Sequence, residues 1–459
     1  MAEDASVLVA RADALAAAGR FDDAKAAYLA ALALKPDHLQ ALNNFGALVH
    51  AHGFRSAART LYAEAARHHP HDPLAQVNLA NSLMETGETE AARLAFEAAL
   101  RARPDFAPGH RGLARLASAA GDHTSAERHL QAGFAAQPVI TQPFFGAKSP
   151  IEVLLLISGV DGDIPLGPVL DPGVFKVTAL APQFFAPDQP LPPHHVVFNA
   201  IGDADLCAKA LEGAERLVRR TDRPVINAPG RVLATGRTAN ARRLAGLEGV
   251  IAPANVLLGR DEAAAVDSAA ALEALGLCLP VAVRAPGYHT GQHFERVDAI
   301  EDLSPALARL PGEQAMVMLF FDTRGPDGAY RKYRAMMIDG RLYPLHLAVS
   351  SAWKVHYFTA DMARSPQHRA EDAAFLADMP GVIGPRAMAA LQRVRAALGL
   401  DYGGVDFALS ADGDLVLFEA NATMALLPPP DDPMWDYRRA PVQAALDAVK
   451  AMIVERART

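Results

Sequence analysis

The chain has 459 residues, which is too long for one ordinary hydrophobic core and predicts two to four domains. Its composition, 51% hydrophobic and 21% charged, is that of a globular protein. A formal net charge of -8 without clustered Lys and Arg argues against a nucleic-acid-binding or anionic-membrane-binding surface.

The first third of the sequence repeats with a period of 34 residues. In each copy a glycine marks a turn between two helices, a small residue allows their close approach, a large residue fills the groove, and a proline ends the second helix. The positions that repeat are Gly19, Gly53, Gly87 and Gly121; Ala24, Ala58, Ala92 and Ala126; Tyr28, Tyr62, Phe96 and Leu130; and Pro36, Pro70, Pro104 and Pro138.

This pattern resembles the tetratricopeptide repeat, a helix–turn–helix unit of 34 residues. The resemblance implies an all-α solenoid of four repeats over residues 1–138, whose concave face binds an extended peptide or another protein. Self-association is the alternative use of such a surface. Amides that recur on the first helices are candidates for contacts with a peptide backbone, although ordinary polar surface also explains them: Asn43, Asn44, Asn78 and Asn81.

Residues 139–150 contain two prolines and no periodicity, which predicts a linker. Residues 151–230 alternate short apolar runs with loops and a helix, which predicts a small parallel α/β domain. Asn199 and Asp203 follow one predicted strand at the edge where open α/β sheets place ligands. Capping of the next helix is the alternative role for both.

Further along, Val250 to Leu257 predicts one strand, which a helix through Leu275 follows. A strand over 279–284 is then expected to run into a loop of small and polar residues, with another strand from Phe294. Such a loop can present backbone N–H groups to phosphate oxygens, and a plain hairpin loop is the alternative. The loop residues that we assign to nucleotide binding are Gly287, His289, Thr290 and Gly291.

The segment from residue 345 to residue 362 concentrates polar side chains in an apolar strand and turn. We expect Lys354 to contact a transferred phosphate, and His346 or His356 to contact a carboxylate or act as a base. Each histidine taken alone is equally explained as an ordinary core or surface residue.

Residues 402–421 predict a β-hairpin with Asp412-Gly413 as a two-residue turn. If Ala411 pairs with Asp414, then Asp406 lies directly opposite Glu419, and Asn421 lies on the same face. Like charges in that arrangement destabilise a sheet unless a divalent cation lies between them. Mg²⁺ takes oxygen ligands of this kind, so we predict a metal site at these three residues, with a solvated hairpin edge as the alternative.

The Gly-Val-Asp strand, the glutamate thirteen residues later and the asparagine two residues beyond it resemble the metal-binding strands of the ATP-grasp superfamily. The branch of glutamate, peptide and ribosomal-protein ligases is the closer likeness. The resemblance extends over about residues 151–440. It implies an α+β ATP-grasp domain of two subdomains over 231–459, preceded by the small α/β domain, with ATP and Mg²⁺ as cofactors. The basic residues at matching positions are Arg237 and Arg284 for the nucleotide and Arg334 for catalysis.

The implied activity is that of a carboxylate–amine ligase, in which a substrate carboxylate takes the γ-phosphate of ATP and an amine then displaces it. The repeats would hold a peptide or protein substrate. The sequence departs from the family because both nucleotide-binding lysines are arginine, and because no Pro-Gly follows Asn421. Two alternatives stay open: a nucleotide-binding adaptor without catalysis, and a phosphotransferase that acts on an acceptor other than a carboxylate.

The compartment that we expect is the cytoplasm. The first 20 residues lack the basic region and apolar run of a signal peptide, and the longest clean apolar run, Val153 to Ile157, is far shorter than a membrane span. Cys207 and Cys278 lie in apolar contexts, which favours reduced thiols over a disulfide, a metal site or a nucleophile. We expect no nucleic-acid or membrane partner, and a homo-oligomer is an alternative to the monomer.

Overall fold

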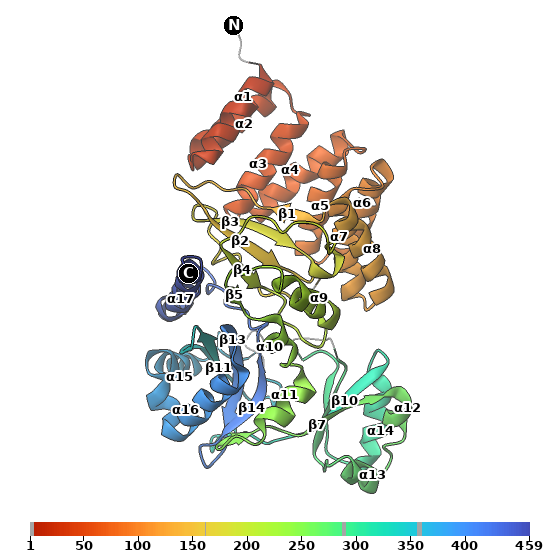
Figure 1. Ribbon diagram of the computed structural model, residues 1–459, viewed down its shortest axis with the longest axis vertical. Coiled ribbons are helices and arrows are strands. Elements are labelled where there is room, and N and C mark those ends of the chain that lie inside the picture. Colours follow the sequence, from red (N-terminus) through yellow and green to blue (C-terminus); the bar gives the residue numbers. More distant parts are fainter. Residues whose placement is uncertain (1–3, 161, 287–290, 356–359) are drawn as a thin grey trace. The chain divides into compact units, whose positions relative to one another are not determined.

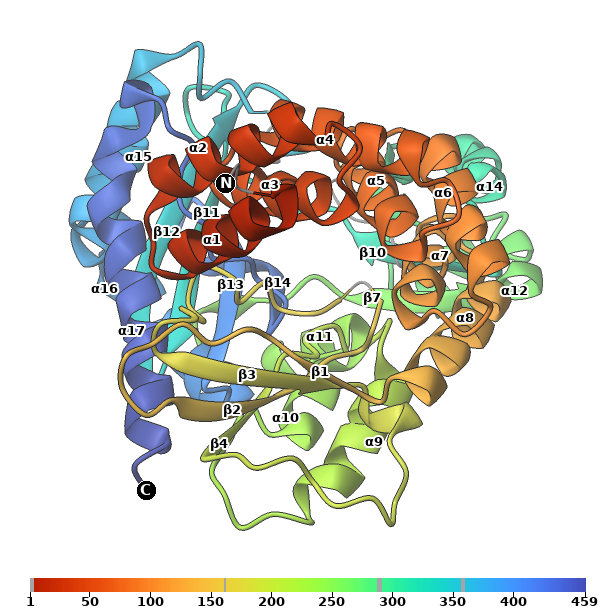
Figure 2. The ribbon, with the colours of Figure 1, turned by 90° about the horizontal axis from the view of Figure 1, so that it is seen from above.

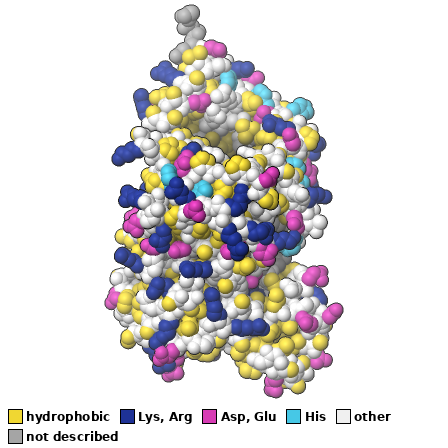
Figure 3. Space-filling model, in the orientation of Figure 1, with side chains coloured by type: hydrophobic (Ala, Val, Ile, Leu, Met, Phe, Trp, Pro, Cys, Tyr) yellow, Lys and Arg dark blue, Asp and Glu magenta, His cyan; other side chains and the backbone are white. Residues whose placement is uncertain are grey.

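The computed structural model describes residues 4–160, 162–286, 291–355 and 360–459. The chain forms two compact units (Figure 1). The first comprises Met1–Ile140, Gly159–Asp161 and Phe184–Ala186, and the second comprises Thr141–Ser158, Gly162–Gln183 and Pro187–Thr459. In the described ranges, no helix combines the length and the apolar character needed to cross a membrane. Figure 3 shows acidic and basic side chains interspersed over the face that it draws.

The first unit consists of helices in four successive pairs, which follow one another along an arc (Figure 2). The turn glycine between the two helices of each pair has a positive φ of 71–83°, a conformation that glycine adopts without strain. The helices are α1 (Ala5–Ala17), α2 (Phe21–Leu34), α3 (Leu39–Ala51), α4 (Arg55–His68), α5 (Pro73–Glu85), α6 (Thr89–Ala102), α7 (Ala107–Ala119) and α8 (His123–Ala136).

The repeated small and large residues form the core of this unit. All eight predicted positions are buried, and the most exposed of them, Tyr62, is only 8% accessible. The amides on the first helices are partly used between repeats, because Asn78 donates a hydrogen bond to buried Asn43, and Asn44 donates to Asp13. Of the amides singled out for peptide binding, Asn81 is the exposed one.

The second unit begins with strands β2 to β5, which have the sheet order β3-β2-β4-β5 and pair in parallel. The parallel arrangement agrees with the α/β pattern expected for 151–230. The short strand β1 lies inside the segment that we expected to be an unstructured linker. The elements are β1 (Val139–Thr141), β2 (Ile151–Leu156), β3 (Phe175–Leu180), β4 (Val196–Asn199), α9 (Ala208–Val218) and β5 (Val225–Ile226).

Two further sheets follow. An antiparallel sheet has the order β7-β10-β8-β9, and helices α12, α13 and α14 contribute to its apolar core. The single strand expected over 250–257 is wrong, because β6 and β7 are separate strands that enter different sheets. The elements are α10 (Pro229–Leu233), α11 (Arg237–Leu244), β6 (Val250–Ile251), β7 (Asn255–Gly259), α12 (Arg260–Ala264), α13 (Ala269–Ala274), β8 (Val281–Arg284), β9 (Phe294–Val297), α14 (Ile300–Arg309) and β10 (Gln314–Leu319).

The last sheet has the order β12-β11-β13-β14-β6 and carries the predicted hairpin. All its pairs are antiparallel except β14–β6. The elements are β11 (Tyr330–Ile338), β12 (Arg341–Ser350), α15 (Pro366–Ala377), α16 (Met379–Leu398), β13 (Tyr402–Leu409), β14 (Leu415–Asn421) and α17 (Arg439–Arg456).

A buried asparagine connects the first sheet of this unit to the last one. Asn227 has a positive φ of 55°, and its side chain accepts hydrogen bonds from the backbone N–H groups of Asp401 and Tyr402. The same side chain donates to the Tyr402 carbonyl, and the Asn227 carbonyl accepts a hydrogen bond from Asn199. Because buried polar groups are costly to leave unpaired, this network fixes the segment after β5 to the end of β4 and to the start of β13.

Candidate functional site

The hairpin of β13 and β14 brings the predicted metal ligands together. Asp406 lies opposite Glu419, and Gly404 lies opposite Asn421. The pairing predicted from the sequence is therefore confirmed at these positions. Asp406 and Asn421 are buried at 3% and 8% exposure, so a fully solvated hairpin edge does not describe this end of the ribbon.

The turn itself differs from the prediction. Ser410 and Asp414 exchange the hydrogen bonds that close the loop, which leaves three residues in it, and Gly413 has a φ of 79°. A three-residue turn shifts the pairing by one residue, so that Leu409 faces Leu415. A β-bulge between Asp406 and Phe407 then restores the expected pairing. Phe418 is the additional residue on β14 and is 45% exposed.

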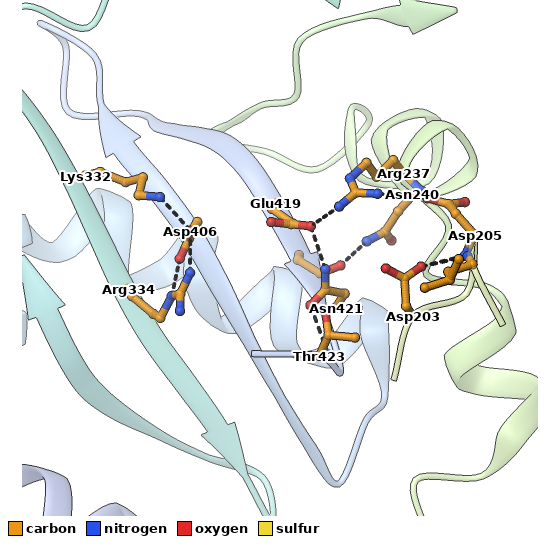
Figure 4. Close-up of polar contacts among 12 residues, drawn as sticks. Asp203, Asp205, Arg237, Asn240, Lys332, Arg334, Asp406, Glu419, Asn421 and Thr423 are labelled. Atoms are coloured by element: carbon orange, nitrogen blue, oxygen red, sulfur yellow. Dashed lines mark hydrogen bonds and ion pairs between the residues drawn. The ribbon is translucent and has the colours of Figure 1, made fainter. Parts of the chain in front are cut away.

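Two cationic side chains of β11 hold Asp406. Arg334 donates to both carboxylate oxygens at 2.5 and 2.8 Å, and Lys332 Nζ lies 3.0 Å from Oδ2 (Figure 4). Burial would raise the pKa of Asp406, but Arg334 and Lys332 outweigh it and hold the pKa far below its usual range. Asp406 is therefore ionised at neutral pH.

A third cation holds Glu419 from the other side of the site. Arg237, the first residue of α11, donates to Oε1 at 2.9 Å, and Asn421 donates to the same oxygen at 2.9 Å (Figure 4). Burial favours the protonated form of Glu419, yet the charge of Arg237 lowers its pKa below the ordinary value. The helix is fixed to the strand by Asn240, which donates to the Ala420 carbonyl at 2.5 Å.

Arg284 at the end of β8 supplies a fourth cation. Its pKa is lowered by burial and by the charge of Arg237, and is raised in part by Glu419 and by Asp203. An arginine stays protonated under such shifts. The basic residues predicted on three separate segments thus share one electrostatic environment with the carboxylates of the hairpin.

The strand-end loop after β4 reaches the same site. A Cβ on Gly202 would lie 2.9 Å from Thr423 Cγ2 and 3.0 Å from the Thr423 nitrogen, so only glycine allows this close approach. The next residue, Asp203, caps the turn before α9 by accepting from the N–H groups of Asp205 and Leu206. Asp205 accepts from the backbone N–H of Arg237 at 3.0 Å. The capping role expected as the alternative for Asp203 is therefore present, at a position next to the candidate site.

The catalytic histidine and lysine predictions have different outcomes. His346 lies opposite Arg334 on β12, is 6% exposed, and has a pKa far below its ordinary value because of burial and the charge of Arg334. Lys354 is exposed, and its Cδ lies 3.9 Å from where a Cβ on Gly291 would be. Four further candidates lie outside the described residues: Gly287, His289, Thr290 and His356.

Lys332 was not among the residues predicted for the site, although it contacts Asp406. Alternation along a strand places Lys332 on the same face of β11 as Arg334, two residues later, and that spacing was a usable signal. The two residues together neutralise Asp406 more completely than either could alone.

The donor atoms fit a hard divalent cation. Asp406 and Glu419 offer carboxylate oxygens from one rigid ribbon, the ligand type that Mg²⁺ prefers. The amide oxygen of Asn421 accepts hydrogen bonds from the backbone N–H and the hydroxyl of Thr423, so it would bind a metal only by giving up one of them. Within the described ranges, no group of three or more His, Cys, Asp or Glu side chains is arranged for a metal. Arg334 and Lys332 make three contacts to the oxygens of Asp406, so a metal would bind at the remaining lone pair or displace one of these contacts.

Comparison with known proteins identifies the first unit. Residues 5–38 and 51–107 each match a family model described as tetratricopeptide repeat. The N-terminal region carries tetratricopeptide repeats. Repeats of this class typically bind protein partners. No curated protein matches the chain.

Solved structures give a likeness over less than a third of the chain. MamA from Desulfovibrio magneticus RS-1 is 22% identical and has a TM-score of 0.27, with 29% of this chain and 76% of that chain covered. A further MamA crystal structure is 20% identical with a TM-score of 0.28, covering 30% and 75%. PilF of Pseudomonas aeruginosa is 19% identical with a TM-score of 0.28, covering 29% and 61%.

Proposed function

We propose that the second unit is an ATP-grasp ligase that binds a magnesium nucleotide and joins a carboxylate to an amine through an acyl phosphate. One observation carries the proposal: two opposed carboxylates on a hairpin are surrounded by four cationic side chains from α11, β8 and β11. Paired carboxylates match a divalent cation, and the cations match the phosphate oxygens of a nucleotide. A structural ion-pair network alone would need fewer positive charges at these two carboxylates.

Each group has a role in this proposal. Arg237 and Arg284 hold phosphate oxygens, while Asp406, Glu419 and Asn421 are the groups that hold Mg²⁺. When bound, Mg²⁺ supplies neutralisation of the charge on the transferred phosphoryl group. Lys332 and Arg334 place positive charge beside that group, and positioning by the three segments supplies most of the rate enhancement. His346 stays neutral and supports Arg334, so we no longer favour it as a base.

The tetratricopeptide repeats hold a peptide or protein in this proposal, either as the substrate that is modified or as the partner that delivers it. The repeat family supports protein binding as a class of function, and the exposed amide of Asn81 is available to such a partner.

The first experiment is a thermal shift with ATP and Mg²⁺, which compares the native chain with the Glu419→Gln and Asp406→Asn variants. A ligand present at a hundred times its Kd stabilises the folded chain by about 2.7 kcal/mol, a shift of a few degrees. We expect a shift in the native chain that requires Mg²⁺ and is lost in both variants. Because the substitutions change the stability of the chain without ligand, the quantity to compare is the change in Tm on addition of ATP and Mg²⁺, and not the Tm itself.

Asp414→Asn is the matched control, because this carboxylate lies in the same hairpin and pairs with Arg386 away from the site. It should keep the nucleotide-dependent shift. A native chain that shows no shift with any nucleoside triphosphate and Mg²⁺ would refute the proposal.

One observation favours a second candidate, nucleotide binding without turnover. Arg334 and Lys332 already make three contacts to the oxygens of Asp406, and both family lysine positions hold arginine. An adaptor of this kind would show the thermal shift but release no ADP with any carboxylate and amine offered. ADP release that depends on a carboxylate substrate would exclude it.

A further inference from the structure

Trp353 connects two of the sheets of the second unit. It follows β12, the edge strand of the sheet that carries the hairpin. Its ring lies edge-on to Phe294 of β9, with centroids 5.0 Å apart, and to Phe320, directly after β10, at 5.5 Å. Phe294 lies in the β7-β10-β8-β9 sheet, and Phe320 directly follows a strand of that sheet. The side chain of Trp353, in the segment after β12, therefore contacts two rings held by the other sheet.

Each ring of this aromatic cluster, Phe294, Phe320 and Trp353, has a cation over its face. Arg296 lies 4.2 Å from the centroid of Phe320, and Lys354 lies 5.5 Å from that of Trp353. Arg284 lies 5.6 Å from the centroid of Phe294. Cation–π contacts of this kind orient the cation as well as stabilising it.

One of these cations, Arg284, belongs to the proposed nucleotide site, and Lys354 was expected from the sequence to contact the transferred phosphate. Arg284 is the register partner of Phe294 across β8 and β9, so a displacement of Phe294 would displace the Arg284 backbone with it. Lys354 directly follows Trp353 in the chain, and its Cδ lies within 4 Å of the position of a Cβ on Gly291. The indole ring thus links Arg284, in the β7-β10-β8-β9 sheet, to Lys354, in the segment that follows β12.

Resting on the proposed function, we propose that Trp353 is a positioning residue that couples the two sheets around the nucleotide. Phosphate held by Arg284 fixes β8 and β9, Phe294 transmits that position to Trp353, and Trp353 sets the position of Lys354. Trp353 itself touches neither nucleotide nor metal in this arrangement. Edge-to-face aromatic pairs have a preferred geometry, which makes the ring a directional contact and not simply a space-filling one.

Fluorescence tests the coupling directly, because the chain contains only two tryptophans. In the Trp435→Phe background Trp353 is the sole indole. We expect its emission to change on titration with Mg²⁺ and ATP, and to saturate at the concentration that saturates the thermal shift. Trp435 lies outside the aromatic cluster, and its ring is tilted by 42° to that of Tyr437 at a centroid distance of 6.5 Å, so its replacement leaves the site intact.

Substitutions at the ring supply the second readout. Trp353→Ala should weaken nucleotide binding by about tenfold, because it removes two aromatic pairs. Trp353→Phe keeps an aromatic ring and should restore binding to within about threefold of native. Phe321→Ala is the matched control: this exposed ring neighbours Phe320 without a place in the cluster, and its loss should leave binding unchanged.

The outcomes separate this inference from the proposed function. A nucleotide-dependent thermal shift with no change in Trp353 emission would show static packing and overturn the inference, while the proposed function would stand. Absence of any nucleotide-dependent shift would overturn both. If Trp353→Ala does not fold, the emission of the Trp435→Phe chain and the binding of Trp353→Phe still decide the question.

Discussion

At the scale of single residues, the charge balance around Asp406 decides the character of the site. A buried carboxylate opposite another carboxylate would normally be protonated. Asp406 instead stays ionised because Arg334 and Lys332 contact both of its oxygens. In the proposed function a divalent cation takes their place at the carboxylate, which frees the same groups for phosphate oxygens.

This balance predicts how stability depends on pH. The pKa values of Asp406 and Glu419 are lowered by folding, so the unfolded chain binds more protons in acid. The stabilisation is complete above the ordinary carboxyl pKa of about 4 and is lost as the pH falls towards the folded values. Asp406→Asn should lower the free energy of unfolding at pH 7 by about 3 kcal/mol, because it leaves Arg334 and Lys332 without their partner.

Urea denaturation between about pH 7 and pH 3 measures both effects. The variant should lose less stability than the native chain between about pH 5 and pH 3, because it lacks one of the titrating groups. Asp414→Asn, whose partner Arg386 is exposed, should cost under about 1 kcal/mol at pH 7. Equal acid slopes in native and Asp406→Asn chains would contradict the assignment.

At the scale of elements, the hairpin shows what the sequence could and could not predict. The alternation of side chains along the two strands and the Asp412-Gly413 pair were sufficient to place Asp406 opposite Glu419. They could not distinguish a two-residue turn from a three-residue turn followed by a bulge, because both lead to the same pairing at Asp406. The misplaced strand over 250–257 has a similar cause, since an apolar run does not say which sheet each half will join.

The three-residue turn depends on the left-handed conformation of Gly413. Gly413→Ala should destabilise the chain by about 1–2 kcal/mol, because a Cβ is strained at this φ even though nothing lies within 4 Å of it. Gly246→Ala is the control, since that exposed glycine has no such φ and equally open surroundings. Its effect should stay within about 0.5 kcal/mol. Equal effects of the two substitutions in urea denaturation would show that the turn geometry is not as described.

At the scale of the whole molecule, the chain combines a first unit that repeats every 34 residues with a second unit that has no such repeat. The 34-residue period predicted every helix pair of the repeats, because each copy repeats its core and turn residues. The second unit has no such redundancy. Its site is built from segments that are distant in sequence, and the contacts of Gly202 with Thr423 and of Asn227 with Tyr402 depend on tertiary structure alone.

Separate cores predict separate unfolding. Scanning calorimetry should resolve two transitions, and Mg²⁺ with ATP should raise only the one that belongs to the second unit. Intrinsic fluorescence assigns it, because both tryptophans, Trp353 and Trp435, lie in that unit. A nucleotide that moved both transitions equally would show that the two units unfold as one.

The hairpin has a consequence for how its length can vary. The three-residue turn pairs Leu409 with Leu415, one residue away from the register of a two-residue turn. The unpaired Phe418 in the bulge then shifts the register by one residue, which places Asp406 opposite Glu419. Removing Phe418 alone would keep Phe407 opposite Leu417 and Asp406 opposite Glu419, because Glu419 would then directly follow Leu417. Removing a paired residue such as Ala408 would instead move Glu419 out of line with Asp406, because a shift of one residue exchanges the faces of a strand. Natural changes in the length of this hairpin are therefore expected in the loop or at the bulge, and not among the paired residues.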